Sequence, residues 1–197
     1  LDKELKNINI TGYTGIGHTR WATHGRPSDM NSHPHYNENK NFVVVHNGII
    51  ENYQELKNML VEKGCKFESE TDSEVIPHLL NYLYNGNIIS TISQVIGKLK
   101  GSFALAVMFS GNKNKIFAVR KDSPLIIGKG EEENYIASDI PAFLEYTDQF
   151  YILEDGEIAE VSSSEINIFD RNGVKIDREK YTVDWDAEMV EKKGYEH

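Results

Sequence analysis

The chain has 197 residues, of which 39% are hydrophobic and 26% are charged, and its formal net charge is -10. This length and composition fit one globular domain, and the negative charge argues against nucleic-acid binding, which relies on clustered Lys and Arg. The single cysteine, Cys65, cannot form an intramolecular disulfide, and no segment has the roughly 18 apolar residues of a membrane span. We therefore expect a cytoplasmic protein that binds neither nucleic acid nor membranes.

The N-terminal third predicts two strands, separated by a polar loop, and then a helix. Strands are expected at residues 15–22 and 41–47, the second because Phe42 and three valines form a short β-branched run. Apolar residues spaced three to four apart predict an amphipathic helix from Ile49 to Lys63, ended by Gly64. A short strand is expected at residues 65–67.

Two more helices are expected in the middle of the chain. Thr71-x-x-Glu74 matches a capping box, in which the hydroxyl accepts from the Glu74 N–H and the carboxylate reaches back. This reading places Asp72 in the first turn of a helix that continues to Gly86. A second apolar stripe predicts a helix over residues 88–100, and both stripes indicate core packing rather than a binding site.

From Gly101 onward the pattern changes to strands, expected at residues 103–109, 116–119, 125–128 and 135–137. Two hairpins are predicted, one over residues 150–161 through Asp155-Gly156 and one over residues 166–174 through Asn172-Gly173. Successive hairpins with the helices grouped between strands predict an α+β fold with antiparallel sheets. The pattern fades beyond Tyr181, so a domain is expected at residues 1–183, followed by a charged segment at 184–197.

Five histidines lie between Gly15 and Gly48, namely His18, His24, His33, His35 and His46. A metal site needs three or four ligands in a suitable geometry. The turn that Pro34 implies is expected to keep the rings of His33 and His35 apart. We therefore predict hydrogen-bonding histidines beside a polar loop, and no metal.

Three polar groups could together hold an amino acid. Arg20 can bind a carboxylate through two parallel hydrogen bonds, although a surface ion pair is the commoner role of an arginine. Asp72 can bind an ammonium group, although stabilisation of a helix dipole would also explain it. Asn47-Gly48 is either a turn or an oxyanion hole, and a helix expected directly after it favours the oxyanion hole. Cys65 has no histidine near it in sequence and is interpreted as packing, not as a nucleophile.

Several motifs, in a fixed order, resemble those of one enzyme family. They are His18–Gly25, Asn31–His35, Val44–Asn52 and Ser69–Glu74, with further matches at residues 123–125, 136–139 and 153–157. These stretches are similar to the glutaminase domain of the glutamine:fructose-6-phosphate amidotransferases, a branch of the glutamine amidotransferases. The resemblance implies an N-terminal-nucleophile hydrolase fold, a four-layer αββα sandwich with two antiparallel sheets, and no cofactor.

The resemblance also implies roles for individual residues. Those around the glutamine would be Arg20, Trp21, Thr23, His24, His33 and Asp72. Within this set, Arg20 would bind the α-carboxylate and Asp72 the α-ammonium, with hydrogen bonds from Thr23 and His24 at the carboxylate end. Asn47 and the Gly48 N–H would form the oxyanion hole.

In this family the nucleophile is a cysteine at the first position of the mature chain. Since the sequence begins at Leu1, we expect an incomplete glutaminase domain that lacks its first strand, first helix and catalytic cysteine, and that is inactive alone. Residues 184–197 would lead toward a sugar-isomerase domain that binds fructose 6-phosphate, and the intact enzyme is expected to be a homo-oligomer. Two alternatives are the glutaminase domain of an amidophosphoribosyltransferase and a non-catalytic module that binds an amino acid.

Overall fold

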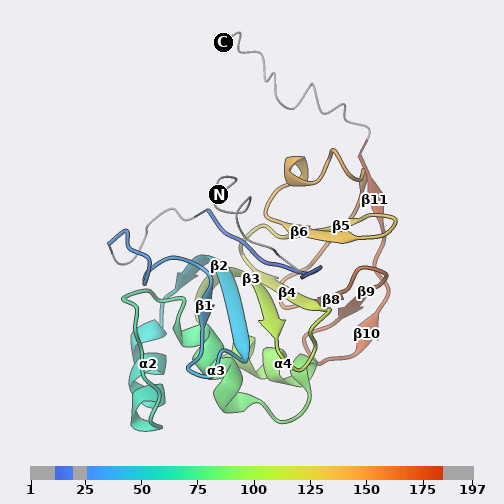
Figure 1. Ribbon diagram of the computed structural model, residues 1–197. Helices are drawn as coiled ribbons and strands as arrows, with labels where there is room; N and C mark the ends of the chain where they lie inside the picture. The colour runs from blue at the N-terminus through green and yellow to red at the C-terminus, as the bar shows by residue number, and fades with distance from the viewer. Residues whose placement is uncertain (1–11, 20–25, 184–197) are drawn as a thin grey trace.

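The computed structural model describes residues 12–19 and 26–183 of the chain. Within these residues, two antiparallel sheets and three α-helices form stacked layers (Figure 1). The larger sheet has the strand order β1-β2-β3-β4-β8-β9-β10, and the smaller sheet has the order β11-β7-β5-β6. No helix in the described part of the chain is long and apolar enough to cross a membrane.

The elements have the following bounds. The larger sheet contains β1 (His35–Tyr36), β2 (Phe42–Ile50), β3 (Gly101–Phe109), β4 (Ile116–Lys121), β8 (Ile158–Val161), β9 (Ile166–Phe169) and β10 (Lys175–Ile176). The smaller sheet contains β5 (Ile126–Lys129), β6 (Asn134–Ala137), β7 (Gln149–Ile152) and β11 (Tyr181–Thr182). The helices are α2 (Tyr53–Glu62), α3 (Val75–Leu83) and α4 (Ile88–Lys98), and a short 3₁₀ helix spans Ile140–Ala142.

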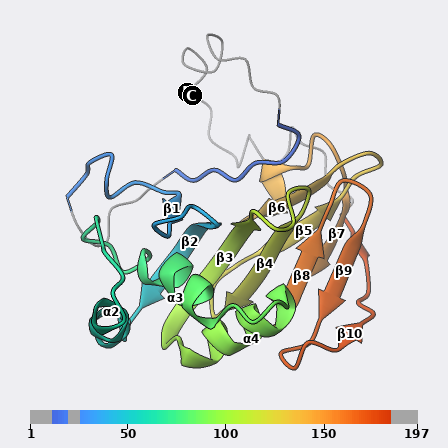
Figure 2. The same cartoon turned by 60° about the horizontal axis from the view of Figure 1, so that its bottom comes forward.

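The three α-helices cover one face of the larger sheet (Figure 2). The apolar residues that predicted them, such as Leu60, Leu79 and Ile92, are buried against that face. Burying a leucine or isoleucine side chain fully contributes about 1.5–3 kcal/mol. Asn87 caps α4, since its side-chain oxygen accepts from the Ser90 N–H at 3.0 Å. The helices predicted from apolar spacing are therefore confirmed.

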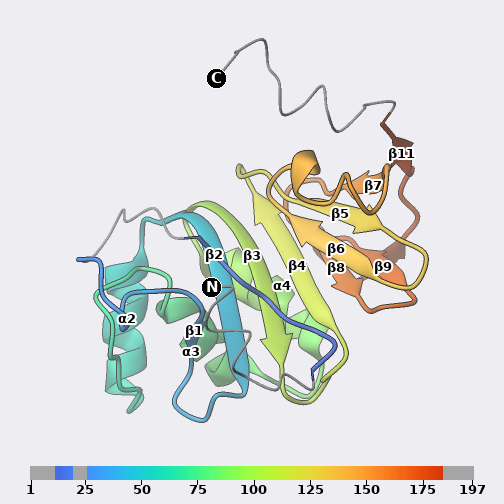
Figure 3. The ribbon, with the colours of Figure 1, turned by 45° about the horizontal axis from the view of Figure 1, so that its top comes forward.

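The smaller sheet packs over the opposite face of the larger sheet, above β4, β8 and β9 (Figure 3). Small side chains such as Ala118 and Ala159 lie here under Leu125, Ile127 and Leu153. Residues 12–19 run across this same face beside the smaller sheet (Figure 3). The α+β class with two antiparallel sheets, predicted from the hairpin pattern, is confirmed.

Strand β2 runs further than its apolar run predicts. It pairs with β3 over nine residues, from Phe42 opposite Phe109 to Ile50 opposite Gly101. Ile49 and Ile50 therefore belong to β2 and not to the predicted helix. Helix α2 begins only at Tyr53. Two short strands were predicted wrongly, because residues 65–67 and the described residues 15–19 are not in strands.

The predicted hairpin over residues 150–161 is wrong, because its two strands belong to different sheets. Strand β7 pairs with β5, whereas β8 pairs with β4 and β9. The Asp155-Gly156 turn is held instead by Arg120, whose side chain contacts Asp155 at 3.0 Å and whose carbonyl accepts from the Gly156 N–H at 2.8 Å. The hairpin through Asn172-Gly173 is confirmed, since β9 pairs with β10.

The capping box was also predicted wrongly. Helix α3 begins at Val75 without a side-chain cap. The Glu74 carboxylate instead accepts from the backbone N–H groups of Glu68 and Ser69 at 2.8 and 2.7 Å, and lies 3.7 Å from His78 Nε2. Burial alone would raise the pKa of Glu74, but the neighbouring His78 above all, together with the hydrogen bonds from the loop, lowers it to about 2. Glu74 therefore fixes the loop ahead of the helix rather than the helix end.

Candidate active site

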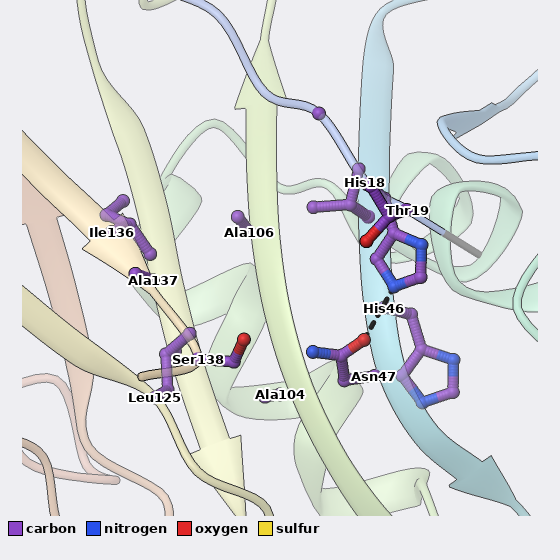
Figure 4. A pocket seen from close by; sticks show the side chains of 12 residues that line it. His18, Thr19, His46, Asn47, Ala104, Ala106, Leu125, Ile136, Ala137 and Ser138 are labelled. Carbon is purple, nitrogen blue, oxygen red and sulfur yellow. Dashed lines mark hydrogen bonds between the residues drawn. The ribbon is translucent and has the colours of Figure 1, made fainter. Parts of the chain in front are cut away.

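A cavity of about 380 Å³ lies between the two sheets (Figure 4). Its size is within the range of small-molecule sites. One wall comes from β2 and β3, the other from β6 together with Ser138 after it and Leu125 just before β5, and residues 17–19 border it. The lining residues are Gly17, His18, Thr19, Val45, His46, Asn47, Ala104, Ala106, Leu125, Ile136, Ala137 and Ser138.

Asn47 presents its side-chain amide to this cavity. Its Oδ1 atom lies 2.5 Å from His18 Nε2, so the amide nitrogen is directed away from His18 and across the cavity toward Ser138 (Figure 4). Alternation along β2 places Asn47 on the face opposite the helices. Asn47 therefore lines the cavity, and its role in a site stays a prediction.

Gly48 is required by the close approach of β2 to β3. Its φ is +120°, and a Cβ atom there would lie 2.1 Å from the Ser102 carbonyl oxygen. Asn47 and Gly48 pair with Ala104 and Phe103 inside the strand. They are thus not a turn, so that interpretation of the dipeptide was wrong, and the residues after it continue β2 instead of beginning a helix. Gly48 is not among the residues that line the cavity.

Four of the five histidines gather beside Asn47. The ring of His33 lies 4.3 Å from that of His18, 4.8 Å from that of His35 and 6.5 Å from that of His46, measured between centroids. The expectation that His33 and His35 are held apart is wrong; the peptide bond between His33 and Pro34 is cis. Within the described residues no group of three or more metal-binding side chains has the arrangement of a metal site.

Asp72 is connected to His46 through Ser73. His46 Nδ1 lies 2.8 Å from Ser73 Oγ, and the Ser73 hydroxyl donates to Asp72 Oδ1 at 3.5 Å. The other Asp72 oxygen accepts from the Ile50 N–H at 2.7 Å. Asp72 is therefore a buried carboxylate in the loop before α3, not a residue of the first helical turn as predicted, and among the described residues it is not part of the cavity wall.

His46 is neutral at physiological pH. Burial lowers its pKa from 6.5 to about 4; the carboxylate of Asp72 opposes this shift and His18 adds to it. An uncharged His46 leaves the hydrogen-bonded chain from β2 to Asp72 without a buried cation. His46 was predicted as a hydrogen-bonding histidine, but its contact with Ser73 was not, because the two residues are 27 positions apart in the chain.

Cys65 lies far from this chemistry. It follows α2, with its N–H donating to the Leu60 carbonyl at 3.0 Å, and packs against the core under the helices. Burial and Glu38 raise the pKa of its thiol, which makes the reactive thiolate scarcer. The interpretation of Cys65 as a packing residue is in keeping with these contacts.

Of the other residues predicted for the site, Arg20, Trp21, Thr23 and His24 lie outside the described residues. Ala104, Ala106 and Ser138 line the cavity and were not predicted as site residues. The alternation of Ala104 and Ala106 with the larger Phe103, Leu105 and Val107 was a usable signal, since alanines on one face of a strand leave space there.

Comparison with known proteins places the chain in a family. Residues 18–145 match the model of the glutamine amidotransferase domain. The chain is 52% identical over its full length to glutamine–fructose-6-phosphate aminotransferase (isomerizing) of Clostridium tetani and 50% identical to that of Aquifex aeolicus. It spans 32% and 33% of the length of these relatives.

Two solved structures share the fold. The glutamine phosphoribosylpyrophosphate amidotransferase of B. subtilis superimposes with a TM-score of 0.67 at 24% identity, over 78% of this chain and 34% of that one. A structure described as the allosteric regulatory enzyme of purine biosynthesis gives 0.61 at 22% identity, over 72% and 31%. The fold is accordingly the N-terminal-nucleophile type found in amidotransferases, and the chain belongs to the glutamine amidotransferase domain family.

Proposed function

We propose that this chain holds glutamine in the cavity between the sheets and supports hydrolysis of its side-chain amide. The observation that carries the proposal is the Asn47 amide nitrogen, which is directed into a cavity walled largely by small and apolar side chains. A fixed donor in such a place stabilises the oxygen that becomes negative in the tetrahedral intermediate of acyl transfer. The Gly48 N–H is proposed as the second donor.

The α-amino and α-carboxylate groups of the glutamine need partners of opposite charge. Asp72 is proposed for the ammonium, because it is a buried carboxylate already oriented by the Ile50 N–H. Arg20 is proposed for the carboxylate, with Thr23 and His24 beside it; this part rests on family membership alone. Trp21 and His33 are proposed to border the bound substrate.

The attacking thiol is proposed to come from a residue that is not among these 197. Cys65 is the only cysteine in the sequence, and its packing beneath the helices keeps it away from Asn47. We therefore expect the 197-residue chain alone to release no glutamate from glutamine. Turnover by purified material of verified mass would contradict this expectation.

The acceptor of the ammonia is proposed to be fructose 6-phosphate, bound by a sugar-isomerase domain of a longer cytoplasmic protein. Support comes from relatives that are about half identical to this chain and are named for that reaction. Supplying the full-length protein with glutamine and either fructose 6-phosphate or phosphoribosyl pyrophosphate distinguishes the two amidotransferase branches. Glucosamine 6-phosphate is the expected product, and phosphoribosylamine would contradict the assignment.

The role of Asn47 is tested by Asn47→Asp in the full-length protein. This substitution keeps the shape of the side chain but replaces the amide donor with an acceptor, and removal of one oxyanion-hole donor lowers kcat by about 10²–10³-fold. Asn114→Asp, in the exposed turn between β3 and β4, is the matched control for the change of charge. Equal rates of glutamate release by the two variants would refute the proposed site.

A further inference from the structure

The orientation of the Asn47 amide is not fixed by the strand that carries it. The amide presents either its nitrogen or its oxygen to the cavity, depending on a rotation of about 180° at its terminal bond. Only the nitrogen can donate to an oxyanion, and the oxygen would repel it. A residue that distinguishes the two ends of the amide therefore controls whether the oxyanion hole exists.

His18 is placed to make this distinction. Its Nε2 atom lies 2.5 Å from Asn47 Oδ1, and this contact is made on the side of the amide away from Ser138 (Figure 4). An amide oxygen only accepts, so the hydrogen must be on His18 Nε2. As long as the ring keeps its hydrogen on Nε2, turning the amide over would set two donors against each other at this distance.

The His18 ring is itself held by its neighbours. It is packed on His33, with ring centroids 4.3 Å apart and planes inclined by 37°. His33 in turn contacts His35, whose Nε2 lies 3.0 Å from Thr71 Oγ1 in the buried loop ahead of α3. The rings thus brace His18 against the larger sheet, so its Nε2–H keeps a fixed direction toward Asn47.

We propose that His18 is a positioning residue, which holds the Asn47 amide so that its nitrogen donates into the cavity. The inference rests on the proposed glutamine hydrolysis and adds a residue to it. Because the oxyanion forms only in the transition state, losing the orientation lowers kcat while leaving the KM for glutamine nearly unchanged. The loss is smaller than that from removing the donor itself, and we expect it to be about 10- to 100-fold in kcat.

The first variant is His18→Phe in the full-length protein. Phenylalanine keeps an aromatic ring against His33 but has no donor for Asn47 Oδ1. The steady-state rate of glutamate release is expected to show the fall in kcat with the KM within about twofold of wild type. A raised KM with unchanged kcat would overturn the inference, because His18 would then act on bound glutamine directly.

The second variant, His18→Gln, supplies an N–H donor at about the distance of Nε2, and it is expected to restore most of the kcat that His18→Phe loses. If both variants lose activity equally, the N–H donor has no role and the inference fails. A merely structural role for the ring would also predict no rescue, since glutamine does not stack as an aromatic ring does.

The decisive comparison repeats His18→Phe in a protein that already carries Asn47→Ala. If His18 acts through Asn47, the second substitution lowers kcat no further. A full additional loss would show that His18 works independently of Asn47 and would overturn the inference. Failure of the wild-type protein to hydrolyse glutamine would instead contradict the proposed function. A failure of the proposed function can thus be distinguished from a failure of the inference about His18.

Discussion

The two faces of the larger sheet differ in the size of their side chains, and β3 shows the difference within one strand. Phe103, Leu105 and Val107 point toward the helices and are 1% exposed, filling the core there. Ala104 and Ala106 point toward the smaller sheet and line a cavity of about 380 Å³. The face covered by the helices therefore contributes stability through close packing. The other face is less closely packed at these alanines, which leaves room for a ligand.

The same division continues in β2. Phe42 and Val44 face the helices and are buried in the core, while Val45 and Asn47 line the cavity. The polar residue of the proposed site thus belongs to the open face of a strand that is held firmly by its other face. Rigid backing of this kind is what keeps a donor in one position during a reaction.

The largest effect on stability is expected from Gly48→Ala, because it forces the two central strands apart. The new Cβ would lie 2.1 Å from the Ser102 oxygen, at a φ of +120° that L-residues rarely adopt. Backbone strain and overpacking together are expected to reduce the free energy of unfolding by about 3–5 kcal/mol. Urea denaturation measures this, and a loss below about 1 kcal/mol would mean that the strands separate easily there.

The contrast between the faces is tested most simply with adjacent residues of β3. Leu105→Ala removes packing under the helices and is expected to lower the free energy of unfolding by about 2–5 kcal/mol. Ala106→Leu fills the cavity, so it is expected to leave stability nearly unchanged while lowering kcat/KM for glutamine by about 10²-fold or more. The comparison fails if Ala106→Leu keeps full activity or if Leu105→Ala is as stable as wild type.

Acid is expected to act first on the link between β2 and Asp72. The unfolded chain binds a proton at His46 near pH 6.5, whereas the folded chain resists it until about pH 4. The free energy of unfolding should therefore fall, by about 3 kcal/mol at most, as the pH drops from 6.5 toward 4. His46→Gln should flatten this part of the curve, and a wild-type stability that is constant over this range would contradict the assignment.

Protonation of Glu74 also lowers the free energy of unfolding as the pH falls, but it does so at lower pH than protonation of His46. Its folded pKa of about 2 lies below its ordinary 4.5, so the stability it contributes is present above pH 4.5 and is lost as the pH falls toward 2. The two groups together predict a two-stage acid transition, and the second stage should persist in His46→Gln.

The smallest effect is expected from Cys65→Ser. This thiol is partly buried against the core beneath the helices and takes no part in the proposed chemistry. Glutamate release by the full-length variant should remain within about twofold of wild type. Loss of more than tenfold would assign Cys65 a catalytic function and would require a different site.

Periodicity predicted the elements that local patterns determine. The apolar stripes of α3 and α4, the β-branched run of β2 and the apolar run of β3 match the structures they form, so their sequence and fold agree. The hairpin through Asp155-Gly156 was mispredicted because a turn sequence does not say which sheet the next strand joins. Arg120, 35 positions away in the chain, holds this turn, and no local pattern predicts that contact.

The site was predictable in its residue types but not in its arrangement. Asn47 follows a strand-like run and was identified, yet its contact with His18 joins residues 29 positions apart and leaves no local signal. The capping-box motif at Thr71 and Glu74 has the right spacing, but Glu74 bonds backbone groups of the preceding loop instead. A long-range contact decided the arrangement at Asn47, whereas bonds to the loop five and six residues earlier decided it at Glu74.

The measurement that tests the central claim most directly is a crystal structure of the full-length protein with glutamate bound. The account predicts the product between the sheets, with one side-chain carboxylate oxygen about 2.7–3.1 Å from Asn47 Nδ2. Glutamate bound elsewhere, for example in the cavity of about 410 Å³ lined by Phe103, Lys121 and Arg171, with the space beside Asn47 empty, would contradict it.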